Sequence, residues 1–196
     1  MNFSQYEFSV LKNTDFLITK RSILQKVTGA FDALSSQLSH HLAKSSVVLP
    51  ANTRLTPKIS KGENYRGLPY IVLDFPSLFS KDSLFMFRVI FLWGYAFSIE
   101  MLVSGDMLKE KADLLLEHAP KIRETLPFIC ISKTPWEYYY DDTIFKPCSE
   151  LDKEAFRHII ENRDFVKLGA RFPLEDYTVL DKEVRTRFSS LMSIIF

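Results

Sequence analysis

The segment LFMFRVIFLWGYAFSIEMLV, residues 84–103, most constrains the fold, because only Arg88 and Glu100 carry charge among its twenty residues. A membrane-spanning helix needs about 20 predominantly apolar residues, and a charge near the bilayer centre costs at least ~2.5 kcal/mol. Only eleven residues separate the two charges, so both would lie within the hydrocarbon. The sequence therefore predicts no membrane span.

The same segment is rich in aromatic and β-branched residues, which favour a pleated sheet. Gly94 lies at its middle, and glycine disfavours a helix interior but fits a tight turn. We therefore predict two strands, 84–93 and 95–104, which turn or bulge near Gly94. Both faces of the first strand are apolar, so it should be central in the sheet, and Arg88 then needs a polar partner or an exposed strand end.

Apolar residues at helical spacing predict helices on both sides of this strand pair. The longest is 14–43, capped by Asn13 or Thr14, with a short helix around 3–11 before it. Its buried face consists of Ile23, Val27, Phe31, Leu34, Leu38 and Leu42. The other predicted helices run from Asp106 to Leu126 with a kink or division at Pro120, from a capping box of Ser149 and Asp152 to Arg163, and from Thr178 onward, with Val184, Phe188, Leu191 and Ile195 on the core face of the last.

Further strands are predicted at 53–61 and 68–75, joined by a turn at 61–64, and at 128–132 and 165–172. Strands cluster before helices, without regular alternation, which favours an α+β fold. We predict one domain, residues 1–196, built from a single twisted, mostly antiparallel sheet packed by several helices.

The net charge of +1 gives no general case for binding nucleic acid, although residues 1–66 carry +5. The first residues show no secretory signal, and Cys130 and Cys148 do not form a disulfide framework. We therefore expect a soluble, cytoplasmic protein with no cofactor, no bound metal, no membrane contact and no nucleic-acid partner. The sequence leaves the oligomeric state open.

Two segments offer candidate binding residues. The basic hairpin consists of Arg54, Lys58, Lys61 and Arg66, whose charges suit phosphate or carboxylate groups. The alternative is that exposed edge strands carry lysine and arginine to prevent aggregation. In the segment PWEYYYDD, residues 135–142, a strand would place Trp136, Tyr138 and Tyr140 on one face and Glu137, Tyr139 and Asp141 on the other.

This aromatic segment has several interpretations. It is either a loop or a strand, and its aromatic residues serve either the core or a recognition surface. Its paired carboxylates are also candidates for acid–base chemistry, but the sequence does not give their separation.

Catalytic motifs of the GxSxG, HExxH, GxxxxGK[ST] and GxGxxG types are absent. Cys148 precedes a predicted helix, where a thiol pKa is lowered, and is the better candidate nucleophile. His158 and Glu161 share a helix face, but two ligands do not make a metal site. A hydrolase or transferase built on Cys148, His158 and nearby acids is therefore the alternative to a binding domain.

The order of these features resembles the bacterial YktB-like domain of unknown function. The resemblance spans roughly residues 14–190 and rests on the strings NYRGLPYIVLDF, LWG, KEKADLLLEHAPKIRETLP and SELDKEAFRHII. It implies a mixed α+β domain with no assigned activity and supplies no catalytic residues. Together these features predict a non-enzymatic binding domain that recognises an anionic ligand or an acidic protein partner through the basic hairpin, with Trp136, Tyr138 and Tyr140 as further contacts.

Overall fold

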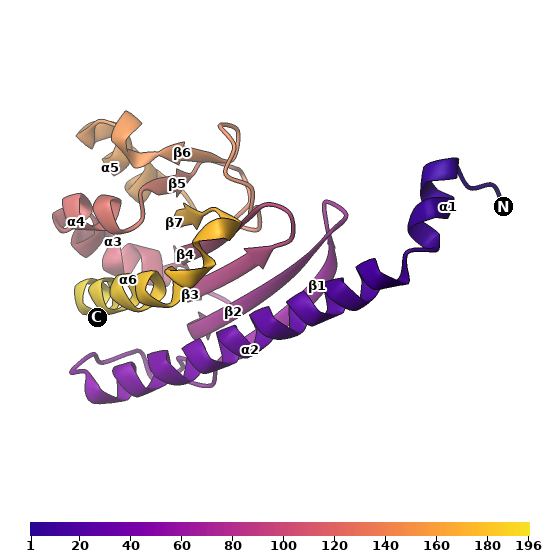
Figure 1. Ribbon diagram of the computed structural model, residues 1–196. Coiled ribbons are helices and arrows are strands. Elements are labelled where there is room, and N and C mark those ends of the chain that lie inside the picture. Colours follow the sequence, from indigo (N-terminus) through magenta and orange to yellow (C-terminus); the bar gives the residue numbers. More distant parts are fainter.

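A computed structural model describes residues 1–196, and its sheet has seven strands in the order β1-β2-β3-β4-β7-β5-β6, with every neighbouring pair antiparallel (Figure 1). The predicted α+β fold is confirmed. The strands are β1 (Lys58–Tyr65), β2 (Leu68–Phe79), β3 (Ser83–Leu92), β4 (Ala96–Gly105), β5 (Phe128–Cys130), β6 (Phe145–Pro147) and β7 (Phe165–Phe172). The helices are α1 (Gln5–Leu11), α2 (Thr14–Lys44), α3 (Asp106–Glu117), α4 (Ala119–Thr125), α5 (Lys153–Asn162) and α6 (Leu180–Ile195), with short 3₁₀ turns η1 (Cys148–Glu150) and η2 (Leu174–Thr178).

The apolar run of residues 84–103 forms the greater part of β3 and β4, as predicted. The two strands pair from Ser83 with Gly105 to Leu92 with Ala96. Gly94 has a φ of 68° in the turn between them, a conformation that glycine adopts without strain. None of the helices has the length and apolarity needed to cross a membrane.

The first hairpin differs from the prediction. Its strands are longer and shifted, and its turn is the two-residue loop of Arg66 and Gly67 instead of residues 61–64. Both loop residues have positive φ, as in a type I′ turn. Gly62 lies within β1, opposite Tyr70. A glycine is needed at this position because the ring of Tyr70 occupies the space that a Cβ would take.

All the larger helices pack on one face of the sheet. The core there includes Phe31 of α2, Leu115 of α3, Ile122 of α4, Phe156 of α5 and Phe188 of α6. The strands contribute every second residue to it, because side chains alternate between the faces of a sheet. α2 is longer than the body it packs on, so α1 and the beginning of α2 project away from the sheet (Figure 1).

The helix predictions are largely confirmed. α2 begins after the cap Asn13, and the chain divides into α3 and α4 just before Pro120. The capping box of Ser149 and Asp152 is wrong, since Ser149 lies in η1 and Asp152 alone caps α5. α6 starts at Leu180 because residues 174–178 form η2, and the predicted apolar face of this helix is buried.

Candidate functional site

The face of the sheet opposite the helices carries charged side chains that are buried. Asp74 of β2 pairs with Arg88 of β3, and Arg88 pairs with Glu100 of β4, so these three residues lie side by side across the sheet. In β7, Gly169 pairs with Glu100. Lys167 precedes Gly169 by two residues, so its side chain lies on the same face of the sheet. We call these four residues the charge row; each is at most 8% exposed.

Arg88 binds Asp74 through two hydrogen bonds. Its Nε donates to Oδ1 at 2.6 Å and one terminal nitrogen donates to Oδ2 at 3.0 Å. Its other terminal nitrogen donates to the Tyr138 hydroxyl at 3.0 Å. Burial opposes the charge on Arg88, but the hydrogen bonds and charge of Asp74 prevail, so the pKa of Arg88 is raised and it stays ionised. The expected polar partner of Arg88 is therefore Asp74.

Lys167 and Glu100 form the second pair, with Nζ 2.9 Å from Oε2 and both side chains 1% exposed. This contact is an ion pair rather than an aligned hydrogen bond. The Lys167 ammonium donates its hydrogen bonds to the carbonyls of Pro135 at 3.0 Å and Glu137 at 2.6 Å. Lys167 thus joins the sheet to the segment that crosses over it.

That segment is the connection between β5 and β6, residues 131–144, which we call the aromatic loop. It lies over the charge row, and Tyr138 and Tyr140 point toward Arg88 and Glu100, respectively. Gly169 makes room for Tyr140, because a Cβ at this position would collide with the Tyr140 hydroxyl. Trp136 stacks over Arg88 at 5.6 Å and remains 45% exposed.

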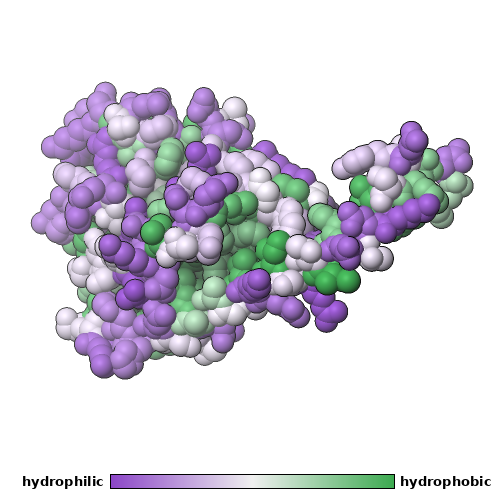
Figure 2. Space-filling model, in the orientation of Figure 1, coloured by the Kyte–Doolittle hydropathy of each residue, from purple (hydrophilic) through white to green (hydrophobic).

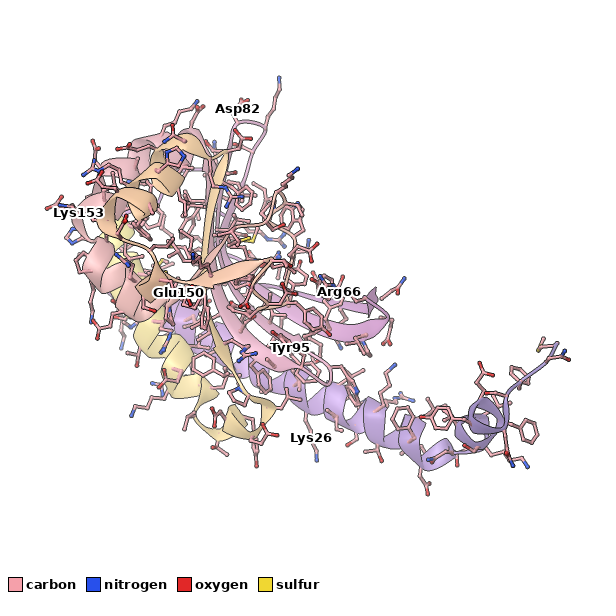
Figure 3. The ribbon with its side chains drawn as sticks, turned by 90° about the horizontal axis from the view of Figure 1, so that it is seen from above. Lys26, Arg66, Asp82, Tyr95, Glu150 and Lys153 are labelled. Atoms are coloured by element: carbon pink, nitrogen blue, oxygen red, sulfur yellow. The ribbon has the colours of Figure 1, made fainter.

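Two hairpin turns hold the aromatic loop at its sides. From the first hairpin, the Tyr65 hydroxyl donates to Glu137 at 2.7 Å and accepts from the backbone N–H of Tyr138 at 2.8 Å. From the second, the Tyr95 hydroxyl accepts from the backbone N–H of Tyr140 at 2.8 Å. Figure 3 shows the two turns side by side, marked by Arg66 and Tyr95, with Lys26 of α2 on the other side of the sheet.

The tyrosines of this face are held in the neutral form. Burial is the main cause in each case, and it raises the pKa of Tyr65, Tyr138 and Tyr140 above the usual value. Neighbouring carboxylates add to the effect, Glu137 for Tyr65 and Glu100 for Tyr140. These shifts move each tyrosine pKa further above pH 7, so none of the three hydroxyls is suited to exchange a proton near pH 7.

The structure brings together four of the seven predicted binding residues. Arg66 lies 3.4 Å from Glu137 and 4.0 Å from Asp141, so its charge is matched within the aromatic loop. The other three members of this group are Trp136, Tyr138 and Tyr140. The segment is a loop, not a strand, yet its even-numbered aromatics still turn toward the sheet, as the alternation of faces predicted.

The remaining three residues lie apart from the loop. Arg54 precedes β1 and donates to the carbonyl of Thr56, so Arg54 and Lys58 do not share a strand as predicted. Lys58 lies opposite Asp74 and Lys61 lies opposite Ile71, so these two lysines point to different faces of the sheet. The charges of the basic hairpin therefore do not converge on one point.

The candidate nucleophile Cys148 is buried in the helical core. Its thiol donates to the carbonyl of Leu126 at 3.6 Å, and burial raises its pKa to about 11, although the nearby charge of Arg123 opposes this shift. His158 is exposed on α5 and contacts Asn162. No hydrogen bond joins Cys148 to His158, and the thiol remains protonated at neutral pH. No group of three or more His, Cys, Asp or Glu side chains is placed to hold a metal ion.

A second surface, which the sequence did not reveal, is an apolar groove of about 600 Å³ on the helical side. Ile23, Val27 and Ala30 of α2 form one wall, Trp93 and Phe97 of the second hairpin form the floor, and Tyr177 of η2 forms the other wall. Phe91 packs edge-on against Trp93 and fixes the floor. Figure 2 shows green, apolar surface in this region, next to the base of the projecting helix.

No protein-family model, curated protein or solved structure matches the chain. The resemblance to the YktB-like domain therefore stays a prediction.

Proposed function

We propose that this chain is a non-enzymatic binding domain and that its apolar groove receives an apolar helical segment of a protein. The observation that carries the proposal is the groove itself, which ten hydrophobic residues out of twelve line. Grooves of this kind take amphipathic helices, whose apolar face supplies the residues that fill them. The exposed Tyr177 and the partly exposed Trp93 are suited to such contacts, because aromatic residues commonly dominate interface energetics.

The opposite face supports a non-enzymatic role. Its buried charges are matched in two pairs, Asp74 with Arg88 and Glu100 with Lys167. Its tyrosines have raised pKa values, and so does the thiol of Cys148. A general acid or base works best with a pKa near the ambient pH. The two charge pairs and the tyrosines hold the aromatic loop on the sheet, which is a structural role.

The anion-binding role of the basic hairpin is the second candidate. Arg54, Lys58 and Lys61 form no ion pair within the chain, which favours a role in attracting an anionic ligand or an acidic partner. Their location on and beside the edge strand β1 fits protection against aggregation equally well. We therefore place the principal binding surface at the groove.

Tryptophan fluorescence tests the groove directly. The chain has two tryptophans, so Trp136→Phe leaves Trp93 in the groove as the only reporter. We expect a saturable change in emission when a synthetic helical peptide with apolar residues at i, i+3, i+4 and i+7 is added. A peptide of equal composition with these residues spread around the helix is the control. No saturable change with either peptide would reject the proposed function.

A further inference from the structure

The N-terminal arm, residues 1–22, is exposed along nearly its whole length although it is rich in large apolar side chains. Residues 1–19 are all exposed, and α1 buries no residue. Figures 1 and 2 show this arm projecting from the body with apolar surface along it. The exposed apolar side chains of the arm are Met1, Phe3, Tyr6, Phe8, Val10, Leu11, Phe16, Leu17 and Ile18.

The arm is apolar on several sides. Phe16, Ile23 and Val27 lie within about 40° of one another around α2, so the stripe that lines the groove continues beyond the body in Phe16. Leu17 and Ile18 follow at steps of about 100° and cover the other sides. Large apolar residues spread over this much of a helix surface are normally buried. Moreover, α1 has seven residues, and isolated helices shorter than about 12 residues are marginal in water. We therefore expect the arm to pack against another protein surface.

The groove of the same chain cannot receive the start of α2. Phe16 precedes Val27 by eleven residues in one continuous helix, which holds them about 16 Å apart along its axis. Phe16 and the groove of its own chain therefore cannot meet unless α2 breaks. A second copy presents the same groove without this restriction.

Charge is also complementary between arm and groove. The arm carries Lys12, Lys20 and Arg21 against Glu7 and Asp15, a net charge of +1, whereas the groove carries the exposed Glu175 and Asp176 of η2 against Lys26 of α2, a net charge of −1. Placing the arm of one copy along the groove of another brings charges of opposite sign together at the rim while apolar residues meet at the centre. This arrangement is typical of specific protein interfaces.

We infer that two copies of this chain associate about a two-fold axis, with the N-terminal arm of each copy in the apolar groove of the other. This inference rests on the proposed function of the groove and names its occupant. The surface is self-complementary, because one chain carries both the arm and the groove, as a two-fold interface requires. Each arm carries four exposed aromatics, Phe3, Tyr6, Phe8 and Phe16. A fully buried aromatic contributes about 150–250 Å², so the exposed parts of the eight aromatics in two arms offer on the order of 900 Å². This area approaches the roughly 1,200–2,000 Å² of a specific interface.

Sedimentation equilibrium of the 196-residue chain tests the inference. We expect a dimer, and we expect Phe16→Glu in the arm and Ala30→Glu in the groove to raise the dissociation constant at least 100-fold each. Both positions are exposed, so circular dichroism should show an unchanged fold. Phe79→Glu is the matched control, because Phe79 is 57% exposed at the end of β2 and should leave the dimer intact.

Mixing the two variants provides the sharper test. The Ala30→Glu chain keeps an unmodified arm and the Phe16→Glu chain keeps an unmodified groove. In an equimolar mixture, this arm can therefore bind this groove, which restores one of the two arm-in-groove contacts of the dimer. We expect a heterodimer in the mixture where each variant alone is monomeric. A monomeric unmodified chain, a dimer that survives both substitutions, or a mixture without heterodimer would each overturn the inference. The titration that decides the function of the groove combines Trp136→Phe with Phe16→Glu, which leaves the Trp93 groove free of the partner's arm. Failure of the dimer and failure of the helix-binding function are then distinguishable.

Discussion

Glu100 and Lys167 form an ion pair of 2.9 Å between neighbouring strands, and both side chains are 1% exposed. Isolated charges in such surroundings are costly, and burial of a pair is tolerated only where additional hydrogen bonds complete it. Here the completion comes from the aromatic loop, whose carbonyls at Pro135 and Glu137 accept from Lys167. The pair therefore couples the position of the loop to the electrostatics of the sheet.

Replacing one member of the pair should be strongly destabilising. In Lys167→Met, Glu100 becomes an uncompensated buried charge and the loop loses two hydrogen bonds, so we expect the free energy of unfolding to fall by about 3–5 kcal/mol. Chemical denaturation measures this loss. Lys153→Met on α5 is the control, because Lys153 is exposed and should change stability by less than about 0.5 kcal/mol.

The double variant Lys167→Met with Glu100→Leu tests the cause. Removing both charges leaves no unpaired ion, so it should recover a substantial part of the lost stability. If the double variant is less stable than Lys167→Met alone, the loss comes from packing and the electrostatic explanation is wrong.

Gly169→Ala should destabilise the chain through Tyr140. A Cβ at residue 169 meets the Tyr140 hydroxyl, so the ring must move and its contact with Glu100 is lost. We expect a loss of about 1–3 kcal/mol, the usual range for overpacking a core. Gly29→Ala is the matched control, because this helical glycine has nothing within 4 Å of a Cβ and alanine stabilises a helix by up to ~1 kcal/mol. Equal effects of the two substitutions would contradict the role of Gly169.

The sequence predicted local structure well wherever a periodic pattern extends over many residues. Residues 165–172 form β7 as expected, and α2 differs from its prediction by one residue. The first hairpin was misplaced because Gly62 and Gly67 are both plausible turn residues. Tyr70, which lies over Gly62, decides between them through a contact across the sheet.

The candidate sites were harder to predict, because they join residues distant in sequence. The need of Arg88 for a partner was evident, but its identity as Asp74 required the register of β2 and β3. The groove combines α2, the second hairpin and η2, whose apolar residues each resemble ordinary core positions in sequence. The exposed apolar residues of the arm carried a detectable signal, since Leu17 and Ile18 lie outside the apolar stripe of the helix to which Phe16 belongs.

Alkaline pH should lower stability through Cys148. The folded chain holds the thiol proton to a pKa of about 11, whereas the unfolded thiol titrates near 9.0. The unfolded state therefore loses the proton first, and stability falls as the pH rises from about 9 to 11, by roughly 2 kcal/mol at pH 11. Urea unfolding of the reduced protein at pH 8 and pH 11 measures the loss. In Cys148→Ala the difference between the two pH values should shrink, and an unchanged difference would contradict the assignment.

Variants of the basic hairpin should distinguish residues that stabilise the chain from residues that are free to bind an anionic ligand. Arg66 pairs with Glu137 and Asp141, so Arg66→Glu should lower the free energy of unfolding by about 1 kcal/mol even without a ligand. Arg54 and Lys58 have no ion-pair partners, so Arg54→Gln with Lys58→Gln, which adds no negative charge opposite Asp74, should leave intrinsic stability nearly unchanged. We expect this double variant to reduce any thermal shift that inorganic phosphate or an oligoglutamate peptide produces at low salt. If both variants show the same ligand-induced shift as the unmodified chain, the hairpin serves only to protect the sheet edge.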